Sequence, residues 1–227
     1  MERREALMFI FLFYFLGGSL CQGSIPARYD GFPYGVESGI GSKIFVEAFF
    51  DPLCPDSRDS WPPLKKILSE YYPHIFFVVH PFPLPYHDNS FVACRALHTA
   101  NKLNVSAIYP LLELFFKNQE KYYNGPTRNK SRASIVDDIA RLGAQAVGSS
   151  PSLFKYAFGD PSSDSAARVS FKYGCTRGVF GAPFFFVNGF LLPDAGSPLD
   201  YKTWKGIIDP LLEENHGKGM KEAVTSL

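Results

Sequence analysis

The stretch Lys43–Trp61, KIFVEAFFDPLCPDSRDSW, decides the fold. Its first part, Lys43–Phe50, is apolar and rich in β-branched and aromatic residues, which is typical of a buried strand. Asp51-Pro52 ends this pattern, and Pro55 suits the first turn of a helix, where a missing N–H costs nothing. We therefore expect Cys54 at a helix N-terminus, where free N–H groups and the helix dipole favour a thiolate. The alternative is a small buried cysteine in a strand-to-helix turn.

The N-terminus has the pattern of a secretory leader. Arg3-Arg4 precedes the apolar run Leu7–Leu16, which is too short to span a bilayer comfortably. This predicts a signal peptide over residues 1–23, cleaved after Cys21 or Gly23. An uncleaved anchor and a buried strand are the alternatives. A cleaved leader implies the secretory pathway, ending outside the cell or in an endomembrane lumen, with no membrane association afterwards.

The mature chain has the composition of a globular protein. About 200 residues suit one domain with a sizeable core. The net charge is +1 with the signs interleaved, so nothing indicates a nucleic-acid partner. Residues 24–42 are rich in Gly, Pro and Ser and are predicted to form an extended arm. Two N-x-S sequons predict surface glycans at Asn104 and Asn129. The oligomeric state does not follow from the sequence.

Three cysteines lie after the leader: Cys54, Cys94 and Cys175. An odd number in a secreted chain leaves at least one free thiol or an intermolecular bridge. Cys94 and Cys175 are either two small apolar side chains or the partners of a structural disulfide, and we predict the disulfide. The spacing of His, Cys and acidic residues indicates no metal site.

The rest of the chain predicts one more strand, a block of helices, and a closing hairpin and helix. His74–His80 is the second strand pattern. The block is expected as the helices Phe91–Leu103, Ser106–Tyr123, Ser131–Val147, Pro151–Phe158 and Asp164–Tyr173. After it we expect a strand at Ala182–Val187, a turn at Asn188-Gly189, a short strand at Phe190–Leu192 and a helix at Asp200–Glu214. Residues 215–227 are predicted to be a polar, frayed tail.

Four stretches resemble, in the same order, the DsbA-like branch of the thioredoxin superfamily. They are FFDPLCPDS at 49–57, HPFPL at 80–84 followed by His87 and ACRA at 93–96, LFFKNQ at 114–119, and GVFGAPFFFVNG at 178–189. The resemblance implies an α/β thioredoxin-like fold, with a central mixed sheet flanked by helices. It divides the domain into residues 43–87 and 178–214, with a helical insertion at 88–177. It also implies a cis-proline, Pro183, packed beside Cys54.

The resemblance assigns site residues and shows two departures. The implied catalytic positions are Cys54, Ser57 and Pro183, and the implied substrate groove is Pro55, Asp56 and Ala182. Relatives that oxidise or reduce disulfides directly have a second cysteine where this chain has Ser57. The residue before the cis-proline is often Thr or Val, and here it is Ala182.

These residues allow single-thiol chemistry. At an ordinary pKa of about 8.5, only ~3% of a thiol is ionised at pH 7. The helix N-terminus and a hydrogen bond from Ser57 should lower the pKa of Cys54, while Asp56 opposes them, so we expect modest activation. A lone thiolate can form a mixed disulfide but needs an outside thiol for release.

The leading hypothesis is a secreted monothiol oxidoreductase or isomerase. Its partners would be protein or peptide thiols and disulfides, with glutathione as a co-substrate and no bound cofactor. The alternatives are a glutathione-dependent transferase or isomerase, and a non-catalytic thioredoxin-like module that binds peptides.

Overall fold

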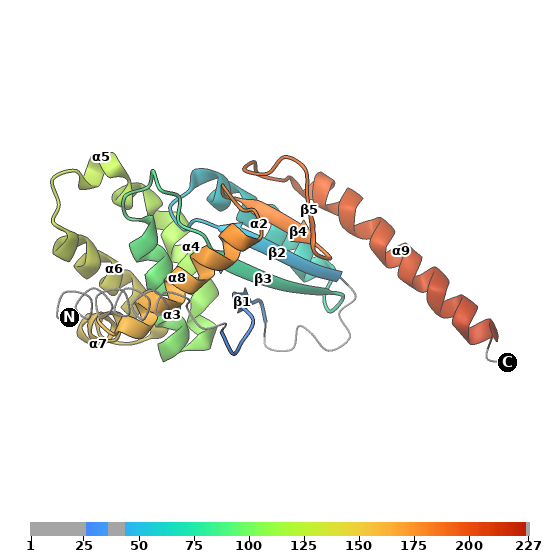
Figure 1. Ribbon diagram of the computed structural model, residues 1–227, viewed down its shortest axis with the longest axis horizontal. Helices are drawn as coiled ribbons and strands as arrows, with labels where there is room; N and C mark the ends of the chain where they lie inside the picture. Colours follow the sequence, from blue (N-terminus) through green and yellow to red (C-terminus); the bar gives the residue numbers. More distant parts are fainter. Residues whose placement is uncertain (1–25, 36–43, 226–227) are drawn as a thin grey trace, which may run out of the picture.

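The computed structural model describes residues 26–35 and 44–225, with side chains described as far as Glu213 (Figure 1). The predicted signal peptide and part of the predicted arm lie outside the described residues. The architecture is a mixed five-stranded sheet with the order β1-β3-β2-β4-β5, flanked by helices. This confirms the predicted thioredoxin-like α/β fold.

The centre of the sheet is a pair of adjacent apolar strands that are joined through a helix. β2 (Ile44–Phe50) and β3 (Ile75–Pro81) pair in parallel, and α2 (Pro55–Glu70) connects them. Both strands are buried almost throughout, which is why their sequences are nearly continuous apolar runs. Pro62 and Pro63 lie inside α2 without ending it.

Three short strands complete the sheet in antiparallel pairs. β4 (Phe184–Val187) pairs with β2, and β5 (Phe190–Leu191) pairs with β4 through the turn at Asn188-Gly189. β1 (Phe32–Pro33) pairs with β3 at the opposite edge. The region predicted as an extended arm therefore contributes a strand to the sheet.

A block of helices lies between β3 and β4, to the left of the sheet in Figure 1. The helices are α3 (Ser90–Leu103), α4 (Ile108–Asn118), α5 (Asn124–Thr127), α6 (Arg132–Val147), α7 (Pro151–Phe158) and α8 (Pro161–Thr176). Two 3-10 turns, η2 (Val105–Ala107) and η3 (Gln119–Tyr122), split the single helix that was predicted over Ser106–Tyr123. The last helix of this block, α8, begins at Pro161 and not at Asp164 as predicted, because Asp160 caps it by accepting the N–H of Ser162.

α9 (Tyr201–Thr225) follows the sheet and extends away from the body of the molecule (Figure 1). Trp204 and Ile208 in its first turns are fully buried in the main core, which also contains Leu64 and Ile67 of α2. The helix continues to Thr225, beyond its predicted end at Glu214.

A second, smaller apolar cluster lies apart from the main core. Its buried members are Phe49, Cys54, Phe82, Leu84, Val179, Ala182, Phe184 and Phe186. These residues come from β2, the turn after it, the loop after β3, and the segment from α8 into β4. The fold therefore places Cys54 where three separate chain segments converge.

Candidate functional site

Cys54 occupies the position that the sequence predicted. It is the N-cap residue of α2, with extended backbone angles, and Pro55 is the first helical residue. The backbone N–H of Arg58 donates to the Cys54 carbonyl at 3.1 Å, which starts the helix. The Cys54 residue is 3% exposed. The thiol thus lies at a helix N-terminus but is almost covered.

The structure brings Ala182 and Pro183 to this thiol from far along the chain. The Ala182-Pro183 peptide bond is cis. The Cys54 thiol donates a hydrogen bond to the Ala182 carbonyl oxygen, with 3.4 Å between sulfur and oxygen. Because a carbonyl oxygen can only accept, this contact requires the protonated thiol.

Ser57 is fully buried one turn along the helix from Cys54. Its hydroxyl oxygen accepts the backbone N–H of Asp51 at 3.3 Å. Burial raises the pKa of the Cys54 thiol, and the charge of Asp51 adds to the increase; hydrogen bonds from Ser57 and from the Asp56 backbone oppose it without cancelling it. The expected modest activation of the thiol is therefore wrong, since desolvation outweighs the helix N-terminus.

Asp51, which the sequence analysis did not single out, is the polar centre of this region. Its carboxylate is fully buried and accepts the N–H of Leu53 at 2.8 Å and of Leu84 at 3.0 Å. The Ser90 hydroxyl and the ring of His87 bind it as well, the latter at 2.9 Å between Nδ1 and Oδ2. This one carboxylate joins the Cys54 turn to the loop after β3 and to the start of α3. An acidic residue directly after a buried strand was the available signal.

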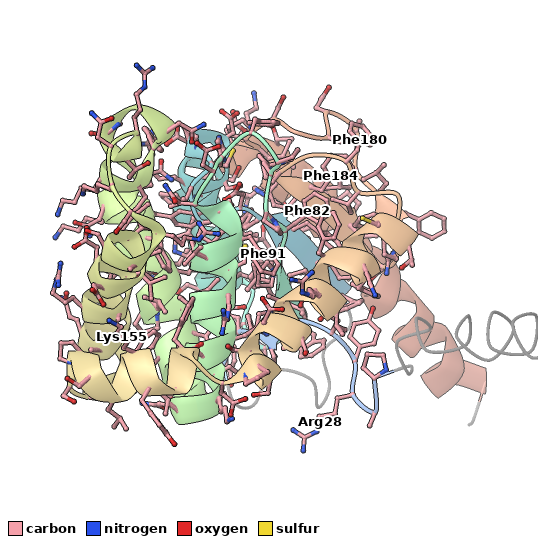
Figure 2. All side chains as sticks on the ribbon, turned by 60° about the vertical axis from the view of Figure 1, so that its left-hand side comes forward. Arg28, Phe82, Phe91, Lys155, Phe180 and Phe184 are labelled. Atoms are coloured by element: carbon pink, nitrogen blue, oxygen red, sulfur yellow. The ribbon has the colours of Figure 1, made fainter. Side chains whose placement is uncertain are left out.

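Exposed aromatic side chains lie on the chain segments that lead to the covered thiol. Tyr86 is 63% and Phe180 80% exposed. Figure 2 shows Phe180 at the edge of the molecule above Phe184, and the two rings meet edge to face at 4.9 Å. A pocket of about 340 Å³ adjoins the Cys54 turn and is lined by Leu53, Pro55, Tyr86, His87, Tyr122, Tyr123, Asn124 and Gly125. Of the predicted groove residues, Pro55 is partly buried, Asp56 is exposed, and Ala182 contacts the thiol through its carbonyl oxygen.

The predicted disulfide between Cys94 and Cys175 is not formed. Both residues are free thiols, Cys94 buried in α3 and Cys175 exposed near the end of α8. Burial raises the pKa of Cys94 well above its ordinary value. Cys94 is therefore a small apolar side chain of the core, which was the alternative interpretation.

The two sequon asparagines lie at the surface. Asn104 and Asn129 are both exposed, and the Asn104 side chain caps η2 by accepting the N–H of Ser106 at 3.0 Å. Within residues 26–35 and 44–213, no group of three His, Cys, Asp or Glu side chains could hold a metal ion. Of the helices in the described part of the chain, none has the length and hydropathy needed to cross a membrane.

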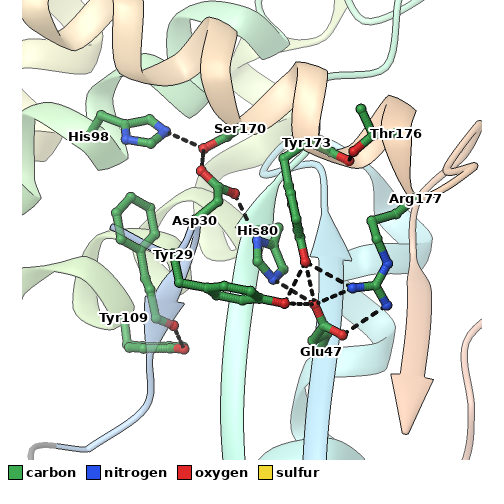
Figure 3. Close-up of polar contacts among 11 residues, drawn as sticks. Tyr29, Asp30, Glu47, His80, His98, Tyr109, Ser170, Tyr173, Thr176 and Arg177 are labelled. Atoms are coloured by element: carbon green, nitrogen blue, oxygen red, sulfur yellow. Dashed lines mark hydrogen bonds and ion pairs between the residues drawn. The ribbon is translucent and has the colours of Figure 1, made fainter. Parts of the chain in front are cut away.

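A second polar cluster, centred on Glu47 of β2, was missed by the sequence analysis (Figure 3). The Glu47 carboxylate is fully buried and forms a two-point ion pair with Arg177, with 3.2 and 3.0 Å between the atoms. The hydroxyls of Tyr29 and Tyr173 donate to the same carboxylate. His80 Nε2 lies 3.4 Å from Glu47 Oε1. The arm, two strands and α8 thus meet at one buried charge.

His80 extends this cluster to the arm. Its Nδ1 is 2.8 Å from Asp30, whose other oxygen accepts the Ser170 hydroxyl at 2.6 Å. Burial by itself would lower the pKa of His80, but Asp30 and Glu47 outweigh it and the pKa is raised. Likewise, burial opposes ionisation of Glu47, yet its contacts with His80, Tyr173 and Arg177 hold its pKa below the ordinary value. The cluster is an ion network that ties the arm to the sheet.

The fold and this arrangement define a thioredoxin-like protein. The chain belongs to the thioredoxin family, whose sequence profile matches residues 41–210. No curated protein sequence matches the chain.

Solved structures share the fold at low sequence identity. A candidate protein-disulfide isomerase from Pseudomonas syringae aligns with a TM-score of 0.66 and 20% identity, over 79% of this chain and 98% of that one. A periplasmic thioredoxin-like protein from Salmonella enterica serovar Typhimurium gives 0.59 and 20%, over 81% and 90%. Oxidised BdbD from Bacillus subtilis gives 0.63 and 15%, over 82% and 100%. At these identities the likeness establishes the fold.

Proposed function

We propose that this protein is a thiol–disulfide oxidoreductase or isomerase that works through Cys54 alone. The observation that carries the proposal is the Cys54 thiol at the α2 N-terminus, against the carbonyl of Ala182, with Ser57 in place of a second cysteine. The fold likeness to a candidate disulfide isomerase supports it. Cys54 would form mixed disulfides with protein or peptide partners, and an outside thiol such as glutathione would release them. Pro183 and Ala182 would border the bound partner.

The raised pKa of Cys54 predicts that the thiol forms mixed disulfides slowly at neutral pH. A thiol that is mostly protonated at neutral pH reacts slowly until a partner or a base takes its proton. Slow formation of mixed disulfides suits isomerisation or capture of a client thiol. Net oxidation by this chain alone would require a second cysteine in reach of Cys54, and Ser57 occupies that position.

The test is mixed-disulfide formation with oxidised glutathione, followed by intact-mass measurement. Because Cys175 is exposed, the experiment uses Cys175→Ser as the parent. The parent should gain one glutathione, and adding Cys54→Ser should abolish the gain. Adding Ser57→Cys instead should create insulin-reducing activity, since the N-cap and the third helical residue are neighbours on the first turn. A parent that gains nothing would overturn the proposal.

One observation favours a second candidate, the non-catalytic peptide-binding module. Cys54 is 3% exposed, and aromatic side chains project around it. The rate of Cys54 alkylation in the folded protein separates the two. A thiol that resists alkylation at every pH at which the protein stays folded would favour the module, whereas a rate that rises with the thiolate fraction supports the enzyme.

We also propose that the protein enters the secretory pathway. The apolar leader and the exposed sequon residues Asn104 and Asn129 support this. Protein secreted by a eukaryotic host should begin near Gln22 or Ser24 and lose mass after glycosidase treatment. A full-length, unmodified chain in the cytosol would contradict both parts.

A further inference from the structure

His87 lines the pocket that adjoins the Cys54 turn. It belongs to the loop between β3 and α3, and its side chain is 20% exposed. Its Nδ1 is 2.9 Å from Asp51 Oδ2, and its ring packs edge to face with the Tyr86 ring, with 4.9 Å between the ring centroids. These contacts fix the orientation of the imidazole from two sides.

The Asp51 contact also fixes which ring nitrogen can act as a base. The Asp51 carboxylate already accepts hydrogen bonds from two backbone N–H groups and from the Ser90 hydroxyl, so it also accepts in its contact with His87. His87 Nδ1 must then carry the proton, and the lone pair of the neutral ring lies on Nε2. Within the described residues, no hydrogen bond engages His87 Nε2, so this atom is available to a ligand.

His87 lines the pocket of about 340 Å³ that also borders Leu53 and Pro55, the two neighbours of Cys54 in the chain. Pockets from about 300 Å³ upward hold small ligands. The pocket therefore offers an entry beside the Cys54 turn for a small thiol or for a cysteine side chain of a peptide.

Single-thiol chemistry creates a need for a base at this place. With Ser57 in the second position, the thiol that releases Cys54 must come from outside, and an ordinary thiol is mostly protonated at neutral pH. We propose, resting on the proposed function, that His87 is a catalytic residue whose Nε2 deprotonates this incoming thiol, with Asp51 holding the ring. Asp51 acts as the positioning residue.

The proposed step balances without an added oxidant or reductant. The S–H proton of the incoming thiol passes to His87 Nε2, and the new thiolate attacks the partner's sulfur in the mixed disulfide. The bond from that sulfur to Cys54 breaks, and Cys54 leaves with the electron pair. The imidazolium returns its proton through water to the Cys54 sulfur. One disulfide bond has replaced another, and His87 is neutral again.

His87→Asn is the decisive variant, because the Asn side-chain N–H can still donate to Asp51 while the basic Nε2 is lost. His74→Asn, on the far side of β3 in the chain, is the matched control. Each variant, made in the Cys175→Ser parent, is loaded at Cys54 with a fluorescein-labelled cysteine. Release is followed by intact mass after addition of excess 2-mercaptoethanol or trifluoroethanethiol. Both thiols are small and carry no charged group other than the thiolate. The electron-withdrawing fluorine atoms lower the pKa of trifluoroethanethiol, so at about pH 8 a larger part of it is ionised than of 2-mercaptoethanol.

A base at His87 predicts a loss that depends on the thiol. His87→Asn should slow release by 2-mercaptoethanol about 10- to 100-fold and leave release by trifluoroethanethiol within about 2-fold of the parent. His74→Asn should change neither. Equal losses with both thiols, or no loss, would overturn this inference and leave the proposed function standing. Failure of Cys54 to accept the labelled cysteine would overturn both. His87→Gln, which places a non-basic amide near Nε2, should repeat the thiol-dependent loss if His87→Asn folds poorly.

Discussion

Two fully buried carboxylates lie four residues apart in this chain, and their surroundings differ. Asp51 accepts backbone N–H groups, a hydroxyl and an imidazole N–H, all from within forty residues of it. Glu47 is bound by side chains of the arm, of β3 and of the end of α8. Asp51 shapes the turn that carries Cys54, whereas Glu47 holds distant segments together. Loss of the Asp51 charge should therefore change reactivity, and loss of the Glu47 charge should change stability.

The largest expected effect is on stability, from Glu47→Gln. The change leaves Arg177 and His80 against a neutral amide in a buried place, and breaking such a pair costs about 3 kcal/mol. Urea unfolding should show this loss, while the pH dependence of Cys54 alkylation stays as in the parent. Glu120→Gln, at an exposed position, is the matched control and should change neither. A Glu47→Gln protein as stable as the parent would remove the distinction between the two carboxylates.

The next effect is on the thiol, from Asp51→Asn. An amide in place of the carboxylate presents N–H groups to donors that need an acceptor, so we expect a smaller loss of about 2 kcal/mol. The charge of Asp51 contributes to the raised pKa of Cys54, after burial. Removing it should shift the alkylation profile of Cys54 to lower pH. Asp56→Asn, an exposed neighbour, is the control for charge alone and should shift the profile less. A profile that does not move in Asp51→Asn would contradict the assignment.

The elements that could be predicted from the sequence are those that depend on local patterns. The strands, the Cys54 turn and most helices follow from local patterns, because apolar runs, proline positions and caps act within a few residues. Ser131, for example, caps α6 through the N–H of Ser134, and α6 begins one residue after the predicted start. The place of Ala182 beside Cys54 followed from the family resemblance alone.

The rest depended on contacts between distant segments. The residues around Glu47 are spread from Tyr29 to Arg177, and no short pattern marks a buried glutamate in an otherwise apolar strand. The Gly-, Pro- and Ser-rich composition predicted an extended arm, but it did not predict that Phe32–Pro33 pairs with β3. The pKa of Cys54 was predicted to be lowered but is raised, because the helix N-terminus can be recognised in the sequence and the burial of Cys54 cannot.

The smallest expected effect is a pH dependence of stability that arises from two histidines in and beside the Glu47 cluster. His98 of α3, 3.2 Å from the Ser170 hydroxyl, has its pKa lowered by burial to about 4. Since the unfolded chain binds a proton at His98 below about pH 6.5 and the folded chain does not, this residue costs stability as the pH falls from 6.5 towards 4. His80 acts in the opposite sense: its raised pKa adds stability that is fully present below about pH 6.5 and is lost at higher pH.

The two histidines can be separated by urea unfolding at about pH 7 and about pH 5, where the shift of His98 is partly expressed. Because His80 and His98 act in opposite senses over this range, the quantity to compare is the change in stability on acidification, which should be more unfavourable in the parent than in His98→Asn by about 1 to 2 kcal/mol. The lowered pKa of Glu47 keeps its ion pair with Arg177 intact over this range, because its contribution disappears only as the pH falls below its ordinary value of 4.5. On acidification, the stability of His74→Asn should change by the same amount as that of the parent. If the stability of His98→Asn and of the parent changes by the same amount on acidification, His98 is protonated in the folded protein at about pH 5. The polar cluster around Asp30 and Ser170 would then be open to water and not buried.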